Sequence, residues 1–217
     1  MAIAFDATGT GVVDPGASLT YSHVCTGSER YLLVGIKGSS TSDTITGCTY
    51  ATVAMTLLRK AQITGSRWAY VFGLFAPASG ANDVVVSASG SDFINAVSVS
   101  LTGVSQAEPE ASNGAQEDSV TNHTGTVTTL TDNAWIMSHF ACSIGWADVG
   151  SGDVRIQGDG NTHGIMTRGP MTPTGSYSNQ AGAGGPLGNW QSSTISLAPF
   201  VAAAGGLMFP RWGSVRR

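Results

Sequence analysis

The chain carries little charge, since Asp, Glu, Lys and Arg make up only 11% of its 217 residues, less than half of the usual share of about a quarter. Glycine, serine and threonine occupy the surface positions that charges would otherwise take. A polar but weakly charged surface is typical of a subunit that packs among neighbours rather than being held apart by its own field. Low charge with 29 glycines would also suit a disordered chain, but 41% hydrophobic residues in regular runs disfavour disorder.

Basic residues are scarce in the body of the chain and gather at its end. Residues 201–217 contain three arginines and no acid, so residues 1–200 hold seven basic and fourteen acidic residues, a formal charge of −7. An acidic body lacks the basic patch that phosphate contacts require, so we expect no direct binding of nucleic acid.

Cysteines and long apolar runs are also few. Cys25, Cys48 and Cys142 are odd in number, widely spaced and without a CxxC motif, so we interpret them as reduced, buried apolar residues. The N-terminal residues 1–11 lack the basic and apolar regions of a signal peptide. The apolar run at 200–208 is too short to cross a membrane. We therefore expect a soluble protein made in a cytoplasm, with no membrane partner.

No window shows apolar residues at helical spacing, whereas many show the period of two that is typical of strands. At Ser91–Gly103, for example, Val97, Val99 and Leu101 alternate with polar residues. Both faces are apolar at Arg67–Ala76 and Tyr31–Lys37, which predicts central strands covered on both sides. The other predicted strands are Leu19–Val24, Thr46–Tyr50, Val53–Leu58, Asp83–Ala88, Val120–Leu130, Ala134–Cys142, Val154–Gln157, Gly164–Arg168 and Thr194–Phe200.

A dozen short strands separated by turn signals predict one all-β domain over residues 1–200, an antiparallel two-sheet sandwich of the jelly-roll or concanavalin-like kind. We expect the N-terminal strands to lie near the last strand. Three segments fall outside the predicted strands. Gln106–Asp118 is acidic and predicts a long exposed loop, and Gln180–Gly188 predicts a flexible or ligand-ordered loop. Residues 201–217 predict an extended C-terminal arm.

Several sequence pieces resemble β-sandwich domains of structural proteins, capsid-associated or tail, from tailed bacteriophages and prophage-like gene clusters. They are TYATVAMTLL (Thr49–Leu58), LFAPASGANDVVVSASGS (Leu74–Ser91), SVSLTGVSQ (Ser98–Gln106), GSYS (Gly175–Ser178), Trp190 and SLAPF (Ser196–Phe200). Together they span most of residues 2–200. The resemblance implies a virion component of jelly-roll or concanavalin-like fold and supplies no catalytic residue. The matched residues look like scaffold, and we expect Trp190 to fill the core.

Motifs of catalysis are missing. Nucleophilic catalysis needs a nucleophile, a base and an orienting acid in one place. His139 and Cys142 are one candidate pair, but a separation of three along a strand places the two on opposite faces. GxSxG, HExxH and phosphate-binding glycine loops are absent from the sequence. We therefore expect no enzyme and no cofactor.

Two weaker site hypotheses remain open. The glycine-punctuated run at 146–161 contains Asp148, Asp153 and Asp159, which are candidate cation ligands or glycosidase carboxylates. The run lacks the regular alternation and terminal glutamate of an EF-hand loop, which favours solvated turns instead. Trp146, Tyr177 and Trp190 lie in or beside glycine-rich loops and are candidates for stacking against sugar rings; burial in the core or at a subunit interface is the alternative.

The apolar and basic residues of the C-terminal arm are the main candidates for a contact surface. A bare tail this apolar would be a liability in water, so the arm either folds back over its own domain or docks on a neighbouring subunit or the capsid. The residues concerned are Leu207, Met208, Phe209, Arg211, Trp212, Arg216 and Arg217.

Three functional hypotheses follow. The first is a non-enzymatic bacteriophage structural protein, a capsid decoration or head-associated protein that binds the shell as an oligomer, for example a trimer. Its partners would be the major capsid protein or other virion subunits, and its location the virion after synthesis in the host cytoplasm. The second is a carbohydrate-binding receptor-recognition or tail-tip module. The third is a polysaccharide-degrading enzyme.

Overall fold

The structure is a computed structural model that describes residues 1–63, 67–182 and 185–202. The regular structure of these residues consists of strands joined by turns and loops, apart from a single 3-10 turn, η1 (Asp159–Asn161). Every pair of neighbouring strands is antiparallel. The predicted all-β class with antiparallel sheets is therefore confirmed, and the arrangement is consistent with a sandwich.

The first half of the chain forms one seven-stranded sheet. Its strands are β1 (Ala4–Cys25), β2 (Tyr31–Gly38), β3 (Ile45–Tyr50), β4 (Val53–Ala54), β5 (Thr56–Ile63), β6 (Arg67–Phe75) and β7 (Gly80–Thr102). They are ordered β4-β3-β7-β2-β6-β5, and β1 pairs with β7 as well. The first part of β7 pairs with β3, and its last part pairs with β2.

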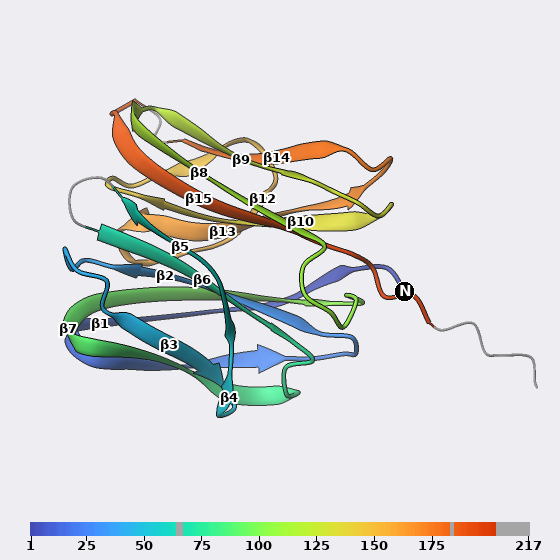
Figure 1. Cartoon of the computed structure of the whole chain (residues 1–217), viewed down its shortest axis with the longest axis horizontal. Coiled ribbons are helices and arrows are strands. Elements are labelled where there is room, and N and C mark those ends of the chain that lie inside the picture. Colours follow the sequence, from blue (N-terminus) through green and yellow to red (C-terminus); the bar gives the residue numbers. More distant parts are fainter. Residues whose placement is uncertain (64–66, 183–184, 203–217) are drawn as a thin grey trace, which may run out of the picture.

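This sheet bends over on itself because β1 and β7 bend together. Their register shifts between Val13 and Ser18, where Gly16 lies opposite Asp92, and such bulges bend and twist a strand pair. Figure 1 shows β7 turning from the lowest layer into the layer above it. The two halves of the sheet enclose a core that includes Tyr50 from β3 and Phe72 from β6.

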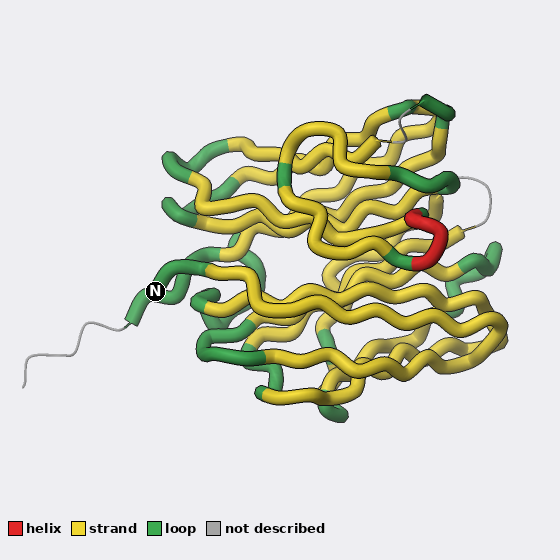
Figure 2. The backbone as a smooth tube through the Cα atoms, turned by 180° about the vertical axis from the view of Figure 1, so that it is seen from behind, coloured by secondary structure: helices red, strands yellow, loops and turns green. Residues whose placement is uncertain are grey.

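The second half of the chain forms two smaller sheets stacked on the first (Figures 1 and 2). The five-stranded sheet has the order β12-β13-β10-β15-β8, and the three-stranded sheet has the order β11-β14-β9. Their strands are β8 (Ala111–Val120), β9 (Asn122–Thr128), β10 (Ala134–Cys142), β11 (Ala147–Ser151), β12 (Asp153–Gln157), β13 (His163–Met171), β14 (Ser176–Gly182) and β15 (Gly188–Leu197).

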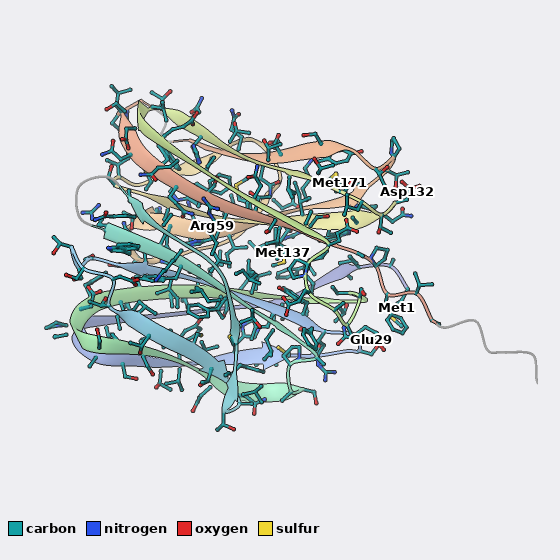
Figure 3. All side chains as sticks on the ribbon, viewed as in Figure 1. Met1, Glu29, Arg59, Asp132, Met137 and Met171 are labelled. Atoms are coloured by element: carbon teal, nitrogen blue, oxygen red, sulfur yellow. The ribbon has the colours of Figure 1, made fainter. Side chains whose placement is uncertain are left out.

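The stacked layers enclose two further cores. One lies between the bent sheet and the five-stranded sheet and contains Leu33, Val99 and Met137. Figure 3 labels Met137. The other lies between the five-stranded and three-stranded sheets and contains Phe140 and Trp190. Because they lie between two cores, β2 and β10 are buried at almost every position, as the two apolar faces of Tyr31–Lys37 predict.

Several predicted boundaries are wrong. The expected loop Gln106–Asp118 is largely strand β8. Its side chains are polar and do not alternate with apolar ones, so the sequence pattern does not predict a strand. The strand is held instead by backbone pairing with β15. Gly114 of β8 leaves the space that the guanidinium of Arg59 fills from β5, and Figure 3 labels this arginine. The expected loop Gln180–Gly188 begins inside β14, although residues 183–184 lie outside the described residues.

Other differences concern how strands join. The predicted strands Asp83–Ala88 and Ser91–Gly103 are one bent strand, β7, and Val53–Leu58 divides into β4 and β5. The N-terminal strand begins at Ala4 rather than at Leu19. Three sheets occur instead of two, because the polar strands β9, β11 and β14 form a sheet of their own.

The two ends of the described chain meet at one end of the sandwich (Figure 2). The α-amino group of Met1 donates to the carbonyl of Phe200 over 2.8 Å. An isolated bridge joins Val104 to Pro199 beside them. The predicted proximity of the N-terminus to the last strand is therefore confirmed, although β1 and β15 do not pair with each other.

Candidate functional site

His123 lies in an arrangement with the connectivity of a catalytic triad. Its Nε2 lies 2.9 Å from the hydroxyl of Ser192, and its Nδ1 lies 2.7 Å from a carboxylate oxygen of Glu117. The ring stacks on Trp190, with centroids 6.1 Å apart. Sequence reasoning missed this cluster because its members come from β8, β9 and β15, and only the stacking of two sheets brings them together.

The order of these groups from the surface inward is the reverse of what hydrolysis requires. A working triad presents its nucleophile to the substrate and buries its acid. Here Glu117 is 51% exposed, whereas Ser192 is completely buried. Gly125 also lies against the Ser192 side chain. The cluster therefore ties three strands together and leaves a substrate no access to the hydroxyl.

A second buried cluster joins His139, His163 and Lys37. Nε2 of His139 lies 3.3 Å from Nδ1 of His163, and Nζ of Lys37 donates to the carbonyl of Cys142 over 2.9 Å. Burial lowers the pKa of Lys37 to about 7, and the nearby Arg67 adds repulsion. Burial lowers the pKa of His139 to about 3 and lowers that of His163 as well. All three side chains are buried between sheets, where burial disfavours their charged forms.

His23 belongs to a third buried cluster. Its Nδ1 lies 2.9 Å from the hydroxyl of Ser98 and its Nε2 lies 3.0 Å from that of Ser100, which donates to Asp6 over 2.7 Å. Burial lowers the pKa of His23 to about 4, against a smaller opposing effect of Asp6. Both ring nitrogens are occupied, so the histidine has no free nitrogen with which to act on a ligand.

The aromatic candidates for sugar binding are mostly inside the protein. Trp190 is fully buried and Trp146 is 3% exposed, so neither presents a ring face to a ligand. This confirms the prediction that Trp190 fills the core. Tyr177 is half-buried, and its hydroxyl donates to the carbonyl of Pro173. The hypothesis of a three-ring sugar platform is therefore wrong for two of its three members.

The acidic candidates whose side chains the structure describes, Asp153 and Asp159, belong to no cluster that could hold a metal ion. Asp153 is exposed and bonds Arg155 over 2.8 Å, and Asp159 is exposed on η1. Asp148 lies on β11, and its side chain is outside what the structure describes. Within the described part of the chain, no three His, Cys, Asp or Glu side chains gather closely enough to hold an ion.

The three cysteines are free and buried, as the sequence predicts. Burial raises the pKa of each thiol, that of Cys48 to about 12. Thiolates are the reactive form, so these cysteines are inert.

One recess, which we call the terminal groove, is lined mainly by apolar residues. Its volume is about 440 Å³, and it lies where the ends of the described chain meet. The side chains that line it are apolar except for that of Asn133, and the ionisable group among the described lining residues is the α-amino group of Met1, which donates to Phe200. The groove therefore suits apolar binding rather than acid–base chemistry. The lining residues are Met1, Ala2, Ile3, Asn133, Trp135, Pro170, Pro199, Phe200 and Val201.

The groove lies where β10 begins, β13 ends and the two ends of the described chain meet. Trp135 is the second residue of β10 and is only half-buried. Its indole lies against Gly169, where a Cβ atom would be 2.3 Å from a ring carbon. Glycine at this position therefore lets the ring lie flat beside β13 and form one wall. The bond from Met1 to Phe200 holds the other side in place.

Two other recesses are more polar. One, of about 440 Å³, is lined mainly by Thr49, Thr52, Asn82 and Asp83. The other, of about 470 Å³, lies between β1 and the loop around η1. Neither gathers titratable side chains in an arrangement that performs chemistry.

The arm residues Leu207 to Arg217 lie outside the described residues, so the structure does not place them. The described chain leads directly to them, because Phe200 and Val201 line the groove. Sequence reasoning singled out the arm but missed the groove, whose walls come from residues 1–3, 133–135, 170 and 199–201.

No family model matches the chain, and comparisons with curated proteins and with solved structures find no match. Among the described residues, no helix is both long and apolar enough to cross a membrane. Function therefore has to be argued from the geometry of the sites themselves.

Proposed function

We propose that this protein is a non-enzymatic structural subunit of a tailed-bacteriophage particle, which binds the shell as a decoration or head-associated protein and associates with copies of itself. The terminal groove is the observation that carries the proposal. It is an accessible apolar recess without ionisable side chains, which suits a protein interface. The four histidines, Ser192 and Lys37 are buried.

The weakly charged surface and the resemblance of residues 2–200 to phage structural domains support the particle assignment. The jelly-roll or concanavalin-like description is the finer form of the same proposal. The partners would be the major capsid protein or other virion subunits, with a trimer as one closed arrangement. The protein would be made in the host cytoplasm and would reside in the virion, without direct contact with nucleic acid or membrane.

A denaturing gel of purified virions tests the location. A decoration protein is present in hundreds of copies per particle, so its band should approach that of the major capsid protein in intensity. A handful of copies per particle would overturn the decoration assignment and favour the tail-tip module, and absence from the particle would overturn the virion assignment altogether.

Labelling with a fluorophosphonate tests the non-enzymatic part. We expect the folded full chain to remain unlabelled, because the hydroxyl of Ser192 is completely buried. The matched control is Ser192→Ala. Labelling that disappears in this variant, while folding is unchanged, would show that the Glu117–His123–Ser192 cluster is a working hydrolase centre.

A further inference from the structure

We infer that the terminal groove receives the C-terminal arm, residues 203–217, of a second copy of this chain. The inference rests on the proposed self-association and names the surface through which it occurs. The other occupants of the groove, the copy's own arm or a different protein, are distinguished by the experiment below.

The groove is suited to apolar side chains presented by an extended segment. Trp135, Pro170 and Phe200 provide flat apolar walls, and Ile3 closes the base with 6% exposure. Large apolar groups remain uncovered around it, since Met1 is 67% exposed and Val201 is 78% exposed. A recess of this kind is a typical site for an apolar anchor.

The arm has the matching chemistry. Its sequence carries Leu207, Met208, Phe209 and Trp212 within six positions, and aromatic residues and methionine are enriched at the centres of interfaces. Pro210 and Gly213 disfavour regular secondary structure there. The arm therefore suits the role of an extended peptide that inserts side chains into a recess.

Length favours the groove of a neighbour over the groove of the same copy. Val201 lines the groove, so the arm starts at its rim. An extended chain advances about 3.3 Å per residue, which carries Phe209 more than roughly 20 Å from Val201 and past its own recess. To reach its own groove the arm would have to reverse direction, whereas it reaches a second copy while running extended.

Charge favours the same arrangement. The arm contributes Arg211, Arg216 and Arg217, and residues 1–200 carry a formal charge of −7. Glu29 and Asp132 lie at the same end of the molecule as Met1 (Figure 3). Each copy therefore presents acidic side chains near its groove to the arginines of an incoming arm.

Disulfide trapping between two co-expressed full-length variants tests the inference. One carries Ala2→Cys, at an exposed position in the groove, and the other carries Phe209→Cys. The native cysteines are buried and free, so they do not compete in the folded protein. We expect mild oxidation to join position 2 of one chain to position 209 of the other, giving a species of twice the mass identified by peptide mass spectrometry.

The matched control replaces Ala2→Cys by Ala81→Cys, an exposed alanine outside the groove, and should give little of this product. A chain carrying both Ala2→Cys and Phe209→Cys tests the alternative. A bond formed only within one chain would overturn the inference in favour of the copy's own arm. No bond between positions 2 and 209 in either experiment would overturn it altogether.

A second measurement does not depend on cysteine. Ala2→Arg places a positive charge in the groove and should weaken self-association at least about tenfold, whereas Ala81→Arg should leave it unchanged. Self-association that disappears on removal of the arm but survives Ala2→Arg would show that the arm docks elsewhere, and the proposed function would still stand. If the disulfide between positions 2 and 209 of two chains forms but the protein is absent from virions, only the proposed function would be overturned.

Discussion

At the scale of single residues, Lys37 shows the cost of placing an amine between two sheets. Its side chain is buried, and its Nζ donates to a backbone carbonyl, that of Cys142. A carbonyl compensates a buried charge less well than a carboxylate does. Burial is accordingly the main cause of the low pKa of Lys37, about 7 against an ordinary 10.5.

We expect Lys37→Met to stabilise the protein by about 1–3 kcal/mol at pH 7, because it removes the desolvation cost of the amine. The wild-type protein should gain stability between pH 7 and pH 9, since the folded state binds fewer protons than the unfolded state in that range. Urea unfolding at both pH values measures this gain. The gain should vanish in Lys37→Met and persist in Lys60→Met, which alters an exposed ion pair.

The buried histidines predict sensitivity to acid. The pKa values of His23 and His139, about 4 and about 3, lie below the ordinary 6.5. The unfolded state therefore takes up protons first, and stability falls as the pH drops below about 6.5. Each of these histidines should lower the free energy of unfolding at pH 5 by about 2 kcal/mol relative to its value at neutral pH.

Unfolding free energies measured from pH 7 to pH 4.5 check this slope. In a folded variant such as His139→Gln, the slope of the free energy of unfolding against pH should be smaller by the contribution of about one proton, which is about 1.4 kcal/mol per pH unit. A wild-type stability that stays constant over this range would contradict the neutral, buried state of these rings.

At the scale of elements, the close approach of β2 and β10 depends on Gly35. A Cβ atom at Gly35 would lie 2.3 Å from a ring carbon of His139. The imidazole thus occupies the space that a side chain on β2 would need. This contact sets the distance between the bent sheet and the five-stranded sheet at the end of their shared core.

Gly35→Ala should therefore destabilise the protein by about 3 kcal/mol, because neither sheet can move without disturbing a packed core. Gly47→Ala is the matched control, since a Cβ atom there meets nothing within 4 Å. The control should change the free energy of unfolding by less than about 0.5 kcal/mol. Equal effects of the two substitutions in thermal or urea unfolding would show that the sheets separate freely at Gly35.

At the scale of the whole molecule, the arm and the groove decide how copies associate. The four large apolar side chains of the arm would bury several hundred Å² on docking, worth several kcal/mol at about 25 cal/mol per Å² before ordering costs are subtracted. We expect a chain lacking residues 202–217 to remain folded and soluble but to oligomerise poorly and to bind its particle weakly.

Light scattering and thermal unfolding of this truncated chain separate the possibilities. Loss of oligomers with an unchanged melting temperature of the monomer supports docking between copies. A clear fall in the melting temperature of the monomer would show instead that the arm packs on its own domain. Normal assembly together with an unchanged melting temperature would contradict both accounts and make the arm passive.

Local pattern alone was enough to predict the elements in which one or both faces are apolar. Tyr31–Lys37 and Ala134–Cys142 are strands close to their predicted bounds, and the burial of Trp190 and of the three cysteines follows from their apolar chemistry. Such residues leave water whatever they pack against, so no knowledge of their neighbours is required. The all-β class follows for the same reason.

Only the tertiary structure decides the features that depend on partners far along the chain. Strand β8 is polar and forms because β15 offers it an unpaired edge. The bend of β7 follows from its register with β1. His123, Ser192 and Glu117 meet only where sheets stack, and the terminal groove exists only because both ends of the described chain reach the same end of the sandwich. Period and composition describe one strand at a time, whereas these sites are made by the spaces between strands.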